Sequence, residues 1–241
     1  MTSILVTGGD GRLARPMREF LPDAHYLSHQ QCDVSSWSRL SAVGESYRPT
    51  CIIHLGAETR YNAPKGAYFV ANICGTGYVI SLARMHNARV VFASTVYVYP
   101  CTAGPYAETD VLQPVGDYAW SKLAGEAAVR SLDDHLIIRG CWYDKLLWER
   151  AVTDGYSTRI PARQAAEWIA QLALSDERGV MNIGGPRRSL YDIVREQNPD
   201  VQPITCAELP PLPYAFPKEA CVDTTKHQDF IARQVWQVDG A

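Results

Sequence analysis

The stretch ILVTGGDGRLA, residues 4–14, gives the strongest indication of the fold. Its short apolar run ends at a glycine, which is typical of a strand buried on both faces of a sheet. Gly8, Gly11 and Ala14 then lie where the strand passes into a helical pattern. The pyrophosphate of a dinucleotide needs unobstructed backbone and the outward N–H groups of a helix start. The stretch therefore predicts a strand, a turn and a helix that together bind a dinucleotide.

Strand-like and helix-like patterns alternate along the chain beyond this stretch. The segments with strand character are 24–30, 51–57, 88–94 and 135–140, and those with helical spacing are 11–21, 71–86 and 118–132. Such alternation implies right-handed crossovers and a parallel sheet that binds ligands at the carboxyl ends of its strands. The fold class that we expect is α/β, a Rossmann-type doubly wound parallel sheet with a small C-terminal substrate-binding lobe.

The final third of the chain changes in character. A loop enters a helix within 157–174, a strand follows at 179–185, and helices are expected at 189–197 and in the tail at 222–234. The segment 198–217 is rich in proline and reads as irregular, while 144–155 leaves room for about three helical turns. We expect an NAD(P)-binding domain over 1–185, with a short substrate-side excursion at 142–160, and a small substrate-binding lobe over 186–241.

Composition narrows the possible partners and the compartment. The chain is 46% hydrophobic and 20% charged, with a net charge of −3, so neither nucleic acid nor an anionic membrane is expected to bind it. Its seven cysteines form no CxxC pair and no cluster with zinc-ligand spacing, which predicts no metal site and fits a reducing compartment. The N-terminus lacks the pattern of a signal peptide, and no apolar run approaches the ~18 residues of a membrane span. We expect a cytoplasmic protein.

DYAWSK, residues 117–122, contains a possible acid/base pair. Tyr118 and Lys122 are four positions apart and share one face of the expected helix. A free phenol titrates near pH ~10, and a neighbouring ammonium lowers its pKa toward the range useful for proton transfer. Because the spacing alone arises readily by chance, the rest of the chain has to decide whether this pair is catalytic.

Seven segments in order resemble the extended short-chain dehydrogenase/reductases. They are TGGDGRLA, CDVSS, IIHLGAET, ANICGTGYVISLA, VVFASTVYVYP, YAWSKLAGE and IIRG, which cover roughly residues 3–140. Within that family the chain is most similar to dTDP-4-dehydrorhamnose reductase and its relatives, through Ser94–Tyr99 and Arg139–Trp142. The closing segments GVMNIGGPRRSLYDIVRE and FPKEACVDTTKHQDF are also similar to that group.

The resemblance implies a role for individual residues. Thr95 would hydrogen-bond the substrate oxygen, Tyr118 would be the general acid/base, and Lys122 would activate it and contact the nicotinamide ribose. The cofactor contacts implied are Gly8, Gly11, Arg12, Leu13, Asp33, Val34, Leu55, Gly56, Ala57 and Asn72, together with Tyr118 and Lys122. The substrate contacts implied are Thr95, Val96, Tyr97 and Trp142. Further residues expected at the rim of the pocket are Tyr143, Arg159 and Arg163, while Cys101 is expected to be a packing residue.

The identity of the cofactor stays open between NADP and NAD. An NAD-binding domain usually places a carboxylate at the end of its second strand, and here none occurs before Asp33. Arg12 and Arg15 could instead face a 2′-phosphate.

The expected reaction is reduction of a carbonyl on a nucleotide sugar or a similar small molecule by NAD(P)H. Val96 and Tyr97 stand where nucleotide-sugar dehydratases carry Asp and Glu, and Tyr97 stands where some epimerases carry a cysteine, which argues against dehydration and 3,5-epimerisation. Two alternatives stay open: a nucleotide-sugar 4-epimerase with tightly bound NAD, and a non-catalytic, cofactor-binding regulatory subunit. Relatives often pair through the helices at 68–86 and 118–131, so a homodimer is expected.

Overall fold

Six parallel strands form the central sheet of this chain in a computed structural model, which describes residues 2–60, 62–64, 66–212 and 214–239. The strand order is β10-β5-β4-β3-β1-β2, with every neighbouring pair parallel. The six strands are β1 (Ile4–Thr7), β2 (His25–Leu27), β3 (Cys51–His54), β4 (Arg89–Ala93), β5 (His135–Arg139) and β10 (Gly179–Asn182). Each lies within a segment that the sequence marked as a strand, and the expected Rossmann-type parallel sheet is confirmed.

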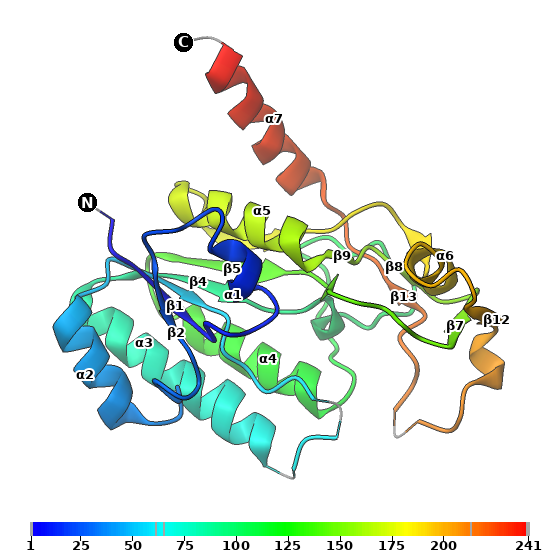
Figure 1. The fold of residues 1–241 in the computed structure, drawn as a ribbon, viewed down its shortest axis with the longest axis horizontal. Coiled ribbons are helices and arrows are strands. Elements are labelled where there is room, and N and C mark those ends of the chain that lie inside the picture. Colours follow the sequence, from blue (N-terminus) through cyan, green and yellow to red (C-terminus); the bar gives the residue numbers. More distant parts are fainter. Residues whose placement is uncertain (1, 61, 65, 213, 240–241) are drawn as a thin grey trace.

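Helices cover both faces of this sheet (Figure 1). Ile4 and Val6 of β1 pack on one side, and Leu5, between them, packs on the other, as the two-residue period of a strand requires. The first side carries α1 (Ala14–Met17) and α5 (Ala162–Leu174), and the second carries α2 (Trp37–Tyr47), α3 (Gly75–His86) and α4 (Asp117–Val129). The two apolar layers fix the sheet between the helices and leave its carboxyl edge open for a ligand.

The order of the strands reverses between β1 and β3, and two glycines meet there. Gly8 follows β1 with a φ of +69°, and a Cβ added to it would lie 2.8 Å from the backbone nitrogen of Gly56, which follows β3. Only glycine permits both the positive φ and this close approach. The reversal is the point where open α/β sheets hold their ligands, so the glycine turn lies at the expected crevice.

Two helical expectations differ from the structure. The helix expected over 11–21 is α-helical only over Ala14–Met17 and continues as turns. The segment 144–155 holds no helix; instead β7 (Arg150–Val152) pairs with β12 (Gln202–Ile204). The adjacent residues Ala151 and Val152 are both buried within the lobe, and pairing with a strand some 50 residues away is not visible in local spacing.

A small lobe lies beyond the carboxyl edge of the sheet. It contains three short sheets, and its apolar core gathers residues from 143–152 and 190–204. The remaining elements of the lobe are β6 (Trp142–Tyr143), β8 (Tyr156–Ser157), β9 (Ile160–Pro161), β11 (Arg188–Ser189), α6 (Leu190–Arg195), the short 3₁₀ helix η3 (Cys206–Glu208) and β13 (Glu219–Ala220). Its strands thus come from both sides of α5, and the domain boundary at 185/186 stays a prediction.

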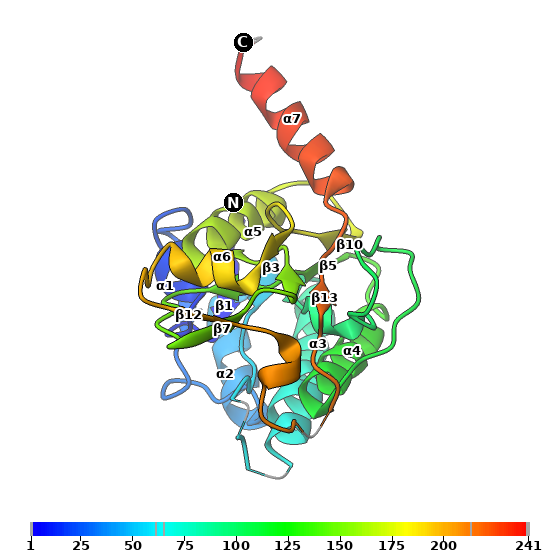
Figure 2. The same cartoon turned by 90° about the vertical axis from the view of Figure 1, so that its right-hand side faces the viewer.

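The tail helix α7 (Thr225–Asp239) is confirmed and projects away from the body of the molecule (Figures 1 and 2). Phe230, near its start, is buried in the same core cluster as α5. Lys226 donates a hydrogen bond of 2.6 Å to the carbonyl of Val180 in β10. The first turns of α7 are therefore attached to the main sheet.

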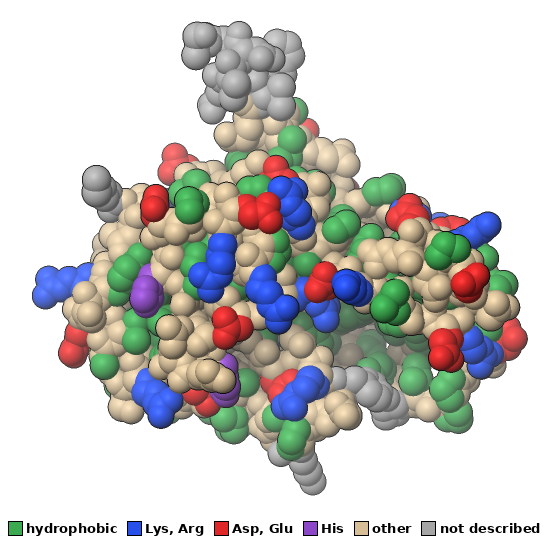
Figure 3. Space-filling view, in the orientation of Figure 1, with side chains coloured by type: hydrophobic (Ala, Val, Ile, Leu, Met, Phe, Trp, Pro, Cys, Tyr) green, Lys and Arg blue, Asp and Glu red, His purple; other side chains and the backbone are tan. Residues whose placement is uncertain are grey.

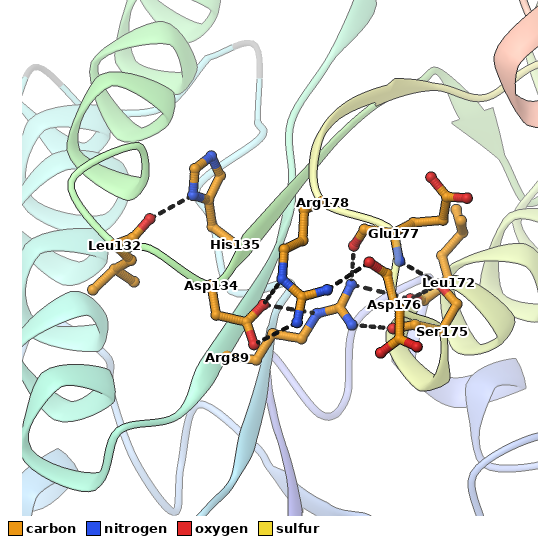
Figure 4. Close-up of polar contacts among 9 residues, drawn as sticks. All are labelled: Arg89, Leu132, Asp134, His135, Leu172, Ser175, Asp176, Glu177 and Arg178. Carbon is orange, nitrogen blue, oxygen red and sulfur yellow. Dashed lines mark hydrogen bonds and ion pairs between the residues drawn. The ribbon is translucent and has the colours of Figure 1, made fainter.

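A buried arginine at the amino edge of the sheet contacts the end of α5 (Figure 4). Arg89, the first residue of β4, is 9% exposed and donates hydrogen bonds to the carbonyls of Ser175, Glu177 and Leu172 at and beyond the end of α5. Its Nε lies 3.7 Å from the carboxylate of Asp134. A cation at the carboxyl end of a helix also compensates the helix dipole, so this cluster ties α5 to the sheet.

Across the described ranges, none of the helices combines the length and the apolar character that a membrane crossing needs.

Candidate active site

A cavity of about 1350 Å³ lies between the carboxyl edge of the sheet and the lobe. The space-filling view shows a hollow between the main body and the lobe (Figure 3). Its walls come from the glycine turn, the ends of β3, β4 and β5, the start of α4, and the lobe. Ligand pockets commonly measure ~300–1,000 Å³, so this cavity is larger than the usual pocket for a single small ligand.

Thr95, the second residue after β4, is buried at 3% exposure and lines the cavity. It is the N-cap of the short 3₁₀ helix η2 (Val96–Val98), where its Oγ1 accepts a hydrogen bond of 3.3 Å from the Tyr97 amide. Its side chain also lies close enough to the phenol of Tyr118 to act on the pKa of Tyr118. The cap fixes the hydroxyl at the site where the resemblance expects it to meet a substrate oxygen.

Tyr118 and Lys122 lie on one face of α4, and both line the cavity. The pKa of Tyr118 is raised, mainly by burial and also by Cys141, while Thr95 and Arg12 act to lower it. The expected lowering of this pKa by Lys122 is therefore not what the structure shows. Burial of the phenol outweighs the nearby cations because desolvation disfavours the phenolate.

The ammonium of Lys122 faces the ring of Phe92, with Nζ 4.0 Å from the ring centre. Burial lowers the pKa of Lys122 to about 7, while Glu126, one turn further along α4, raises it. Near pH 7 the amine and the ammonium forms of Lys122 are therefore both populated. A ligand with hydroxyl acceptors at this position would restore the charged form.

A fully buried ion pair lies behind these residues. Glu126 and Arg139 are each 0% exposed, and Nη2 of Arg139 lies 2.7 Å from Oε2 of Glu126. The other carboxylate oxygen accepts a hydrogen bond of 2.5 Å from Ser94, the residue before Thr95. Arg139 also donates to Tyr99, at 2.8 Å. The pair therefore joins the ends of β4 and β5 to α4, directly below the three candidate residues.

Asn72 lies in a π-helical turn, η1 (Phe69–Cys74), which leads into α3. Its side chain accepts from the Glu58 amide at 2.7 Å and donates to the Glu58 carbonyl at 3.0 Å and to Ser121 at 2.8 Å. Ser121 in turn donates to the carbonyl of Tyr118, at 2.7 Å. Asn72 thus holds the loop after β3 against α4, and it does not line the cavity itself. π-Helical turns often mark functional sites.

The residues expected to bind the cofactor divide into two groups. Those that line the cavity are Gly8, Gly11, Arg12, Leu13, Leu55, Ala57, Tyr118 and Lys122. Gly56 lies behind the wall, where its amide donates to Thr7 Oγ1 at 3.1 Å. Asp33 and Val34 lie outside the lining: Asp33 accepts two hydrogen bonds from Ser35, and Val34 packs in the space above Gly56 and Gly75. Their contact with an adenine stays a prediction.

Some of the residues expected to contact the substrate line the cavity, and others lie outside its lining. Tyr97 and Trp142 line the cavity, as does Arg159. Val96 is 1% exposed and lies in a separate apolar cluster, because the 3₁₀ turn directs it away from the cavity. Tyr143 and Arg163, which were expected at the rim, also lie outside the residues that line the cavity. Tyr143 belongs to the lobe core, and Arg163 is exposed and paired with Glu19.

Several residues that line the cavity were not predicted from the sequence. They include Thr59, Tyr68, Asp117, Trp120, Lys145 and Tyr214. Tyr68 lies with its ring centre 6.1 Å from that of Tyr118. Most of them come from loops or helix starts without a periodic pattern. Behind the cavity, Glu126 and Arg139 do stand out in the sequence, because each is a charged residue within an otherwise apolar segment.

Curated relatives match the N-terminal part of the chain. The dTDP-4-keto-6-deoxy-D-glucose reductase of Streptomyces niveus is 33% identical over 148 residues, which is 57% of this chain and 51% of that protein. The dTDP-4-dehydrorhamnose reductase of Aggregatibacter actinomycetemcomitans is 30% identical over 153 residues, 59% of this chain and 52% of that protein. The matched part spans about half the length of these relatives.

The fold is that of a solved enzyme over nearly the whole chain. The dTDP-4-dehydrorhamnose reductase of Bacillus anthracis, in complex with NADP, superposes with a TM-score of 0.83 at 22% identity and covers 95% of this chain and 92% of its own. At this level of identity the likeness establishes the fold. Residues 1–146, which contain the glycine turn, Thr95, Tyr118 and Lys122, match the family described as the RmlD substrate binding domain. The chain is therefore a member of the RmlD substrate-binding domain family.

Proposed function

We propose that this protein is an NAD(P)H-dependent reductase of a carbonyl group on a nucleotide sugar. The observation that carries this proposal is the convergence of Thr95, Tyr118 and Lys122 on one cavity that also contains the glycine turn. The matched relatives are named as reductases of dTDP-4-keto sugars, which supports the same substrate class here. Whether the protein prefers NADPH or NADH stays open, although Arg12 and Arg15 both line the cavity near the turn.

The glycine turn fits a dinucleotide. A Cβ on Gly11 would lie 2.9 Å from the carbonyl oxygen of Gly8, and that oxygen accepts a hydrogen bond of 2.8 Å from the Gly11 amide. The bare backbone lets a pyrophosphate approach the start of α1, as in other doubly wound folds. Lys122 would bind the ribose hydroxyls, and these acceptors would stabilise its ammonium form.

Thr95, Tyr118 and Lys122 would each have a different role in the reduction of a carbonyl group. A bound reduced nicotinamide supplies the hydride. Thr95 orients the substrate oxygen by a hydrogen bond, and Tyr118 donates its phenolic proton to that oxygen as negative charge develops on it. Once protonated, Lys122 favours the resulting phenolate through its positive charge. The Glu126–Arg139 pair holds α4 and the end of β4 in register, so that the side chains of Thr95 and Tyr118 stay close together.

Replacement of the candidate acid tests the proposal. Tyr118→Phe removes only the hydroxyl and is expected to lower turnover at least about a hundredfold, the usual scale for a general acid, with little change in the Kd for NADPH. The assay follows NADPH consumption with dTDP-4-keto-6-deoxy sugars. Tyr78→Phe on α3, outside the cavity, is the matched control. Near-normal turnover of Tyr118→Phe would remove the phenol from the mechanism.

The stoichiometry of the cofactor separates the alternatives. A reductase consumes one NAD(P)H per product, whereas a 4-epimerase recycles a tightly bound NAD and shows no net consumption. A regulatory subunit would bind the cofactor without turnover. Homodimerisation through α3 and α4 stays a prediction, and the exposed apolar side chains Phe69, Val70 and Trp120 on or near these helices support it. Light scattering of the purified protein measures it.

A further inference from the structure

Arg159 differs from the other cations of the cavity in its surroundings. It lies between β8 and β9 on the wall that the lobe contributes, and it is partly buried. Nη2 donates to the hydroxyl of Tyr97 at 3.3 Å, and Nε donates to Ser157 Oγ at 3.4 Å. The guanidinium carbon lies 5.5 Å from the centre of the Trp148 ring. All of these partners are neutral.

The described residues offer Arg159 no carboxylate within ion-pair distance, whereas Arg139, Arg163 and Arg187 each have one. A guanidinium has five N–H donors in a planar fork, and two long hydrogen bonds to hydroxyl groups leave most of that capacity unused. A partly desolvated charge without a counter-charge is costly unless a ligand supplies one. The surroundings of Arg159 are therefore those expected of a residue that binds an anionic ligand.

The charged residues that line the cavity also favour an anionic ligand. The lining includes four cationic residues, Arg12, Arg15, Lys145 and Arg159, and the partly charged Lys122, against two acidic ones, Asp117 and Asp144. The protein as a whole has a net charge of −3. An excess of positive charge in the cavity of a protein with a negative net charge raises the local concentration of anionic ligands.

The position of Arg159 distinguishes a substrate anion from a cofactor anion. Its partner Tyr97 follows Thr95 by two residues, on the side of the cavity where the reacting carbonyl is expected. Lys145 lines the same cavity from the segment between β6 and β7. Arg12 and Arg15, by contrast, belong to the glycine turn and the start of α1. Two cations on the lobe side suit a group with more than one negative charge, such as a diphosphate, better than a single carboxylate.

We propose that Arg159, assisted by Lys145, binds the diphosphate of the substrate and thereby selects phosphorylated sugars over neutral carbonyl compounds. This inference rests on the proposed function. Trp148 and Tyr97 fix the plane of the guanidinium, so that it can present two parallel N–H groups to a phosphate. Arg159 acts in substrate selection and takes no part in the proton transfer.

The test measures binding by calorimetry to the protein saturated with NADP⁺. The probes are thymidine diphosphate, inorganic pyrophosphate and thymidine, which lacks the anion. Wild-type protein is expected to bind the first two, and Arg159→Gln to bind them about ten- to a hundredfold more weakly, the scale of losing charged hydrogen bonds. Arg159→Lys should recover part of the loss, and Lys145→Gln, a change at an exposed side chain, should weaken binding by a smaller factor.

Arg163→Gln makes the same change in charge four residues away, outside the cavity, and is expected to stay within about twofold of wild type. Wild-type protein that binds neither anionic probe overturns the proposal, as does Arg159→Gln with wild-type affinity. A fall in the preference of Arg159→Gln for NADPH over NADH would assign the residue to the cofactor's phosphate and also overturn it. Failure of the proposed function is recorded separately, as absence of NADP(H) binding or of NADPH-dependent turnover.

Discussion

Arg139 and Arg89 are buried arginines on neighbouring strands at opposite ends of the same sheet. Arg139 ends β5 and pairs with the carboxylate of Glu126, and both side chains are fully buried. Arg89 begins β4 and is held chiefly by backbone carbonyls around the end of α5. Its only carboxylate contact among the described residues is Asp134, at 3.7 Å, whose side chain is 43% exposed.

The two ends therefore use different means to neutralise a buried charge. At the amino edge, the carbonyl dipoles at the end of α5 compensate the charge of Arg89. These contacts attach α5 to the sheet. At the carboxyl edge, a full negative charge has been buried at the cost of desolvating two ions. That carboxylate also bonds Ser94 and raises the pKa of Lys122. The difference indicates that the Glu126–Arg139 pair serves the candidate active site as well as stability.

The largest effect should follow from breaking the pair at the carboxyl edge. Arg139→Met leaves the Glu126 carboxylate buried without its partner and is expected to lower the free energy of unfolding by about 3–5 kcal/mol. Turnover should fall too, because Ser94 and α4 lose their common partner. Urea unfolding measures the first effect and NADPH consumption the second. Arg139→Met combined with Glu126→Leu should recover much of the stability; without that recovery, the cost lies in lost packing instead of an unpaired charge.

A pH dependence should appear at the carboxyl edge through Lys122. Because its pKa is lowered from 10.5 to about 7, the unfolded chain holds a proton between these values that the folded chain has released. The free energy of unfolding therefore rises with pH across this window. Between pH ~7 and ~9, wild type should gain about 2–3 kcal/mol relative to Lys122→Met.

Urea titrations at several pH values measure this difference. Lys226→Met, which removes an exposed lysine of α7, is the control and should follow the wild-type pH dependence. Equal slopes for wild type and Lys122→Met would mean that the buried amine keeps its ordinary pKa. Saturating NADP⁺ should reduce the slope, because ribose acceptors would favour the ammonium form in the folded protein.

Disrupting the amino edge should cost less and leave catalysis intact. Arg89→Met removes hydrogen bonds to three carbonyls that water can partly replace, so a loss of about 2 kcal/mol is expected. The KM and kcat of the proposed reductase reaction should stay within about twofold of wild type. A clear drop in kcat would mean that the two ends of the sheet are coupled, and the contrast between anchor and active site would fail.

The sheet could be predicted from the sequence because it depends on local patterns, whereas the roles of Thr95, Tyr118 and Lys122 were implied by the family resemblance. Apolar runs mark strands buried on both faces, and the four-residue spacing of Tyr118 and Lys122 places them on one face of a helix. Parallel topology explains why Thr95 lies near the other two, since it brings the carboxyl ends of the strands to one edge.

Other features depend on pairings that no local pattern reveals. The strands of the lobe are two or three residues long, and β7 meets β12 across some 50 residues of chain. A single 3₁₀ turn decides that Tyr97 and not Val96 faces the cavity. The charges of Glu126 and Arg139 were visible in the sequence, but their pairing was not, since the two residues lie on different elements. The raised pKa of Tyr118 likewise depends on burial, which spacing does not report.

The smallest effect tests whether Asp134 contributes anything to the amino-edge cluster. Its carboxylate meets Arg178 at 3.1 Å and Arg89 at 3.7 Å, but it is 43% exposed, so water and salt screen both contacts. Asp134→Asn keeps the shape and removes the charge, and it is expected to cost less than about 1 kcal/mol, with the difference vanishing in high salt. Thermal unfolding at low and high ionic strength measures it. A loss as large as that of Arg89→Met would mean that the carboxylate holds the arginine and the α5 carbonyls do not, and the two ends of the sheet would then neutralise their arginines in the same way.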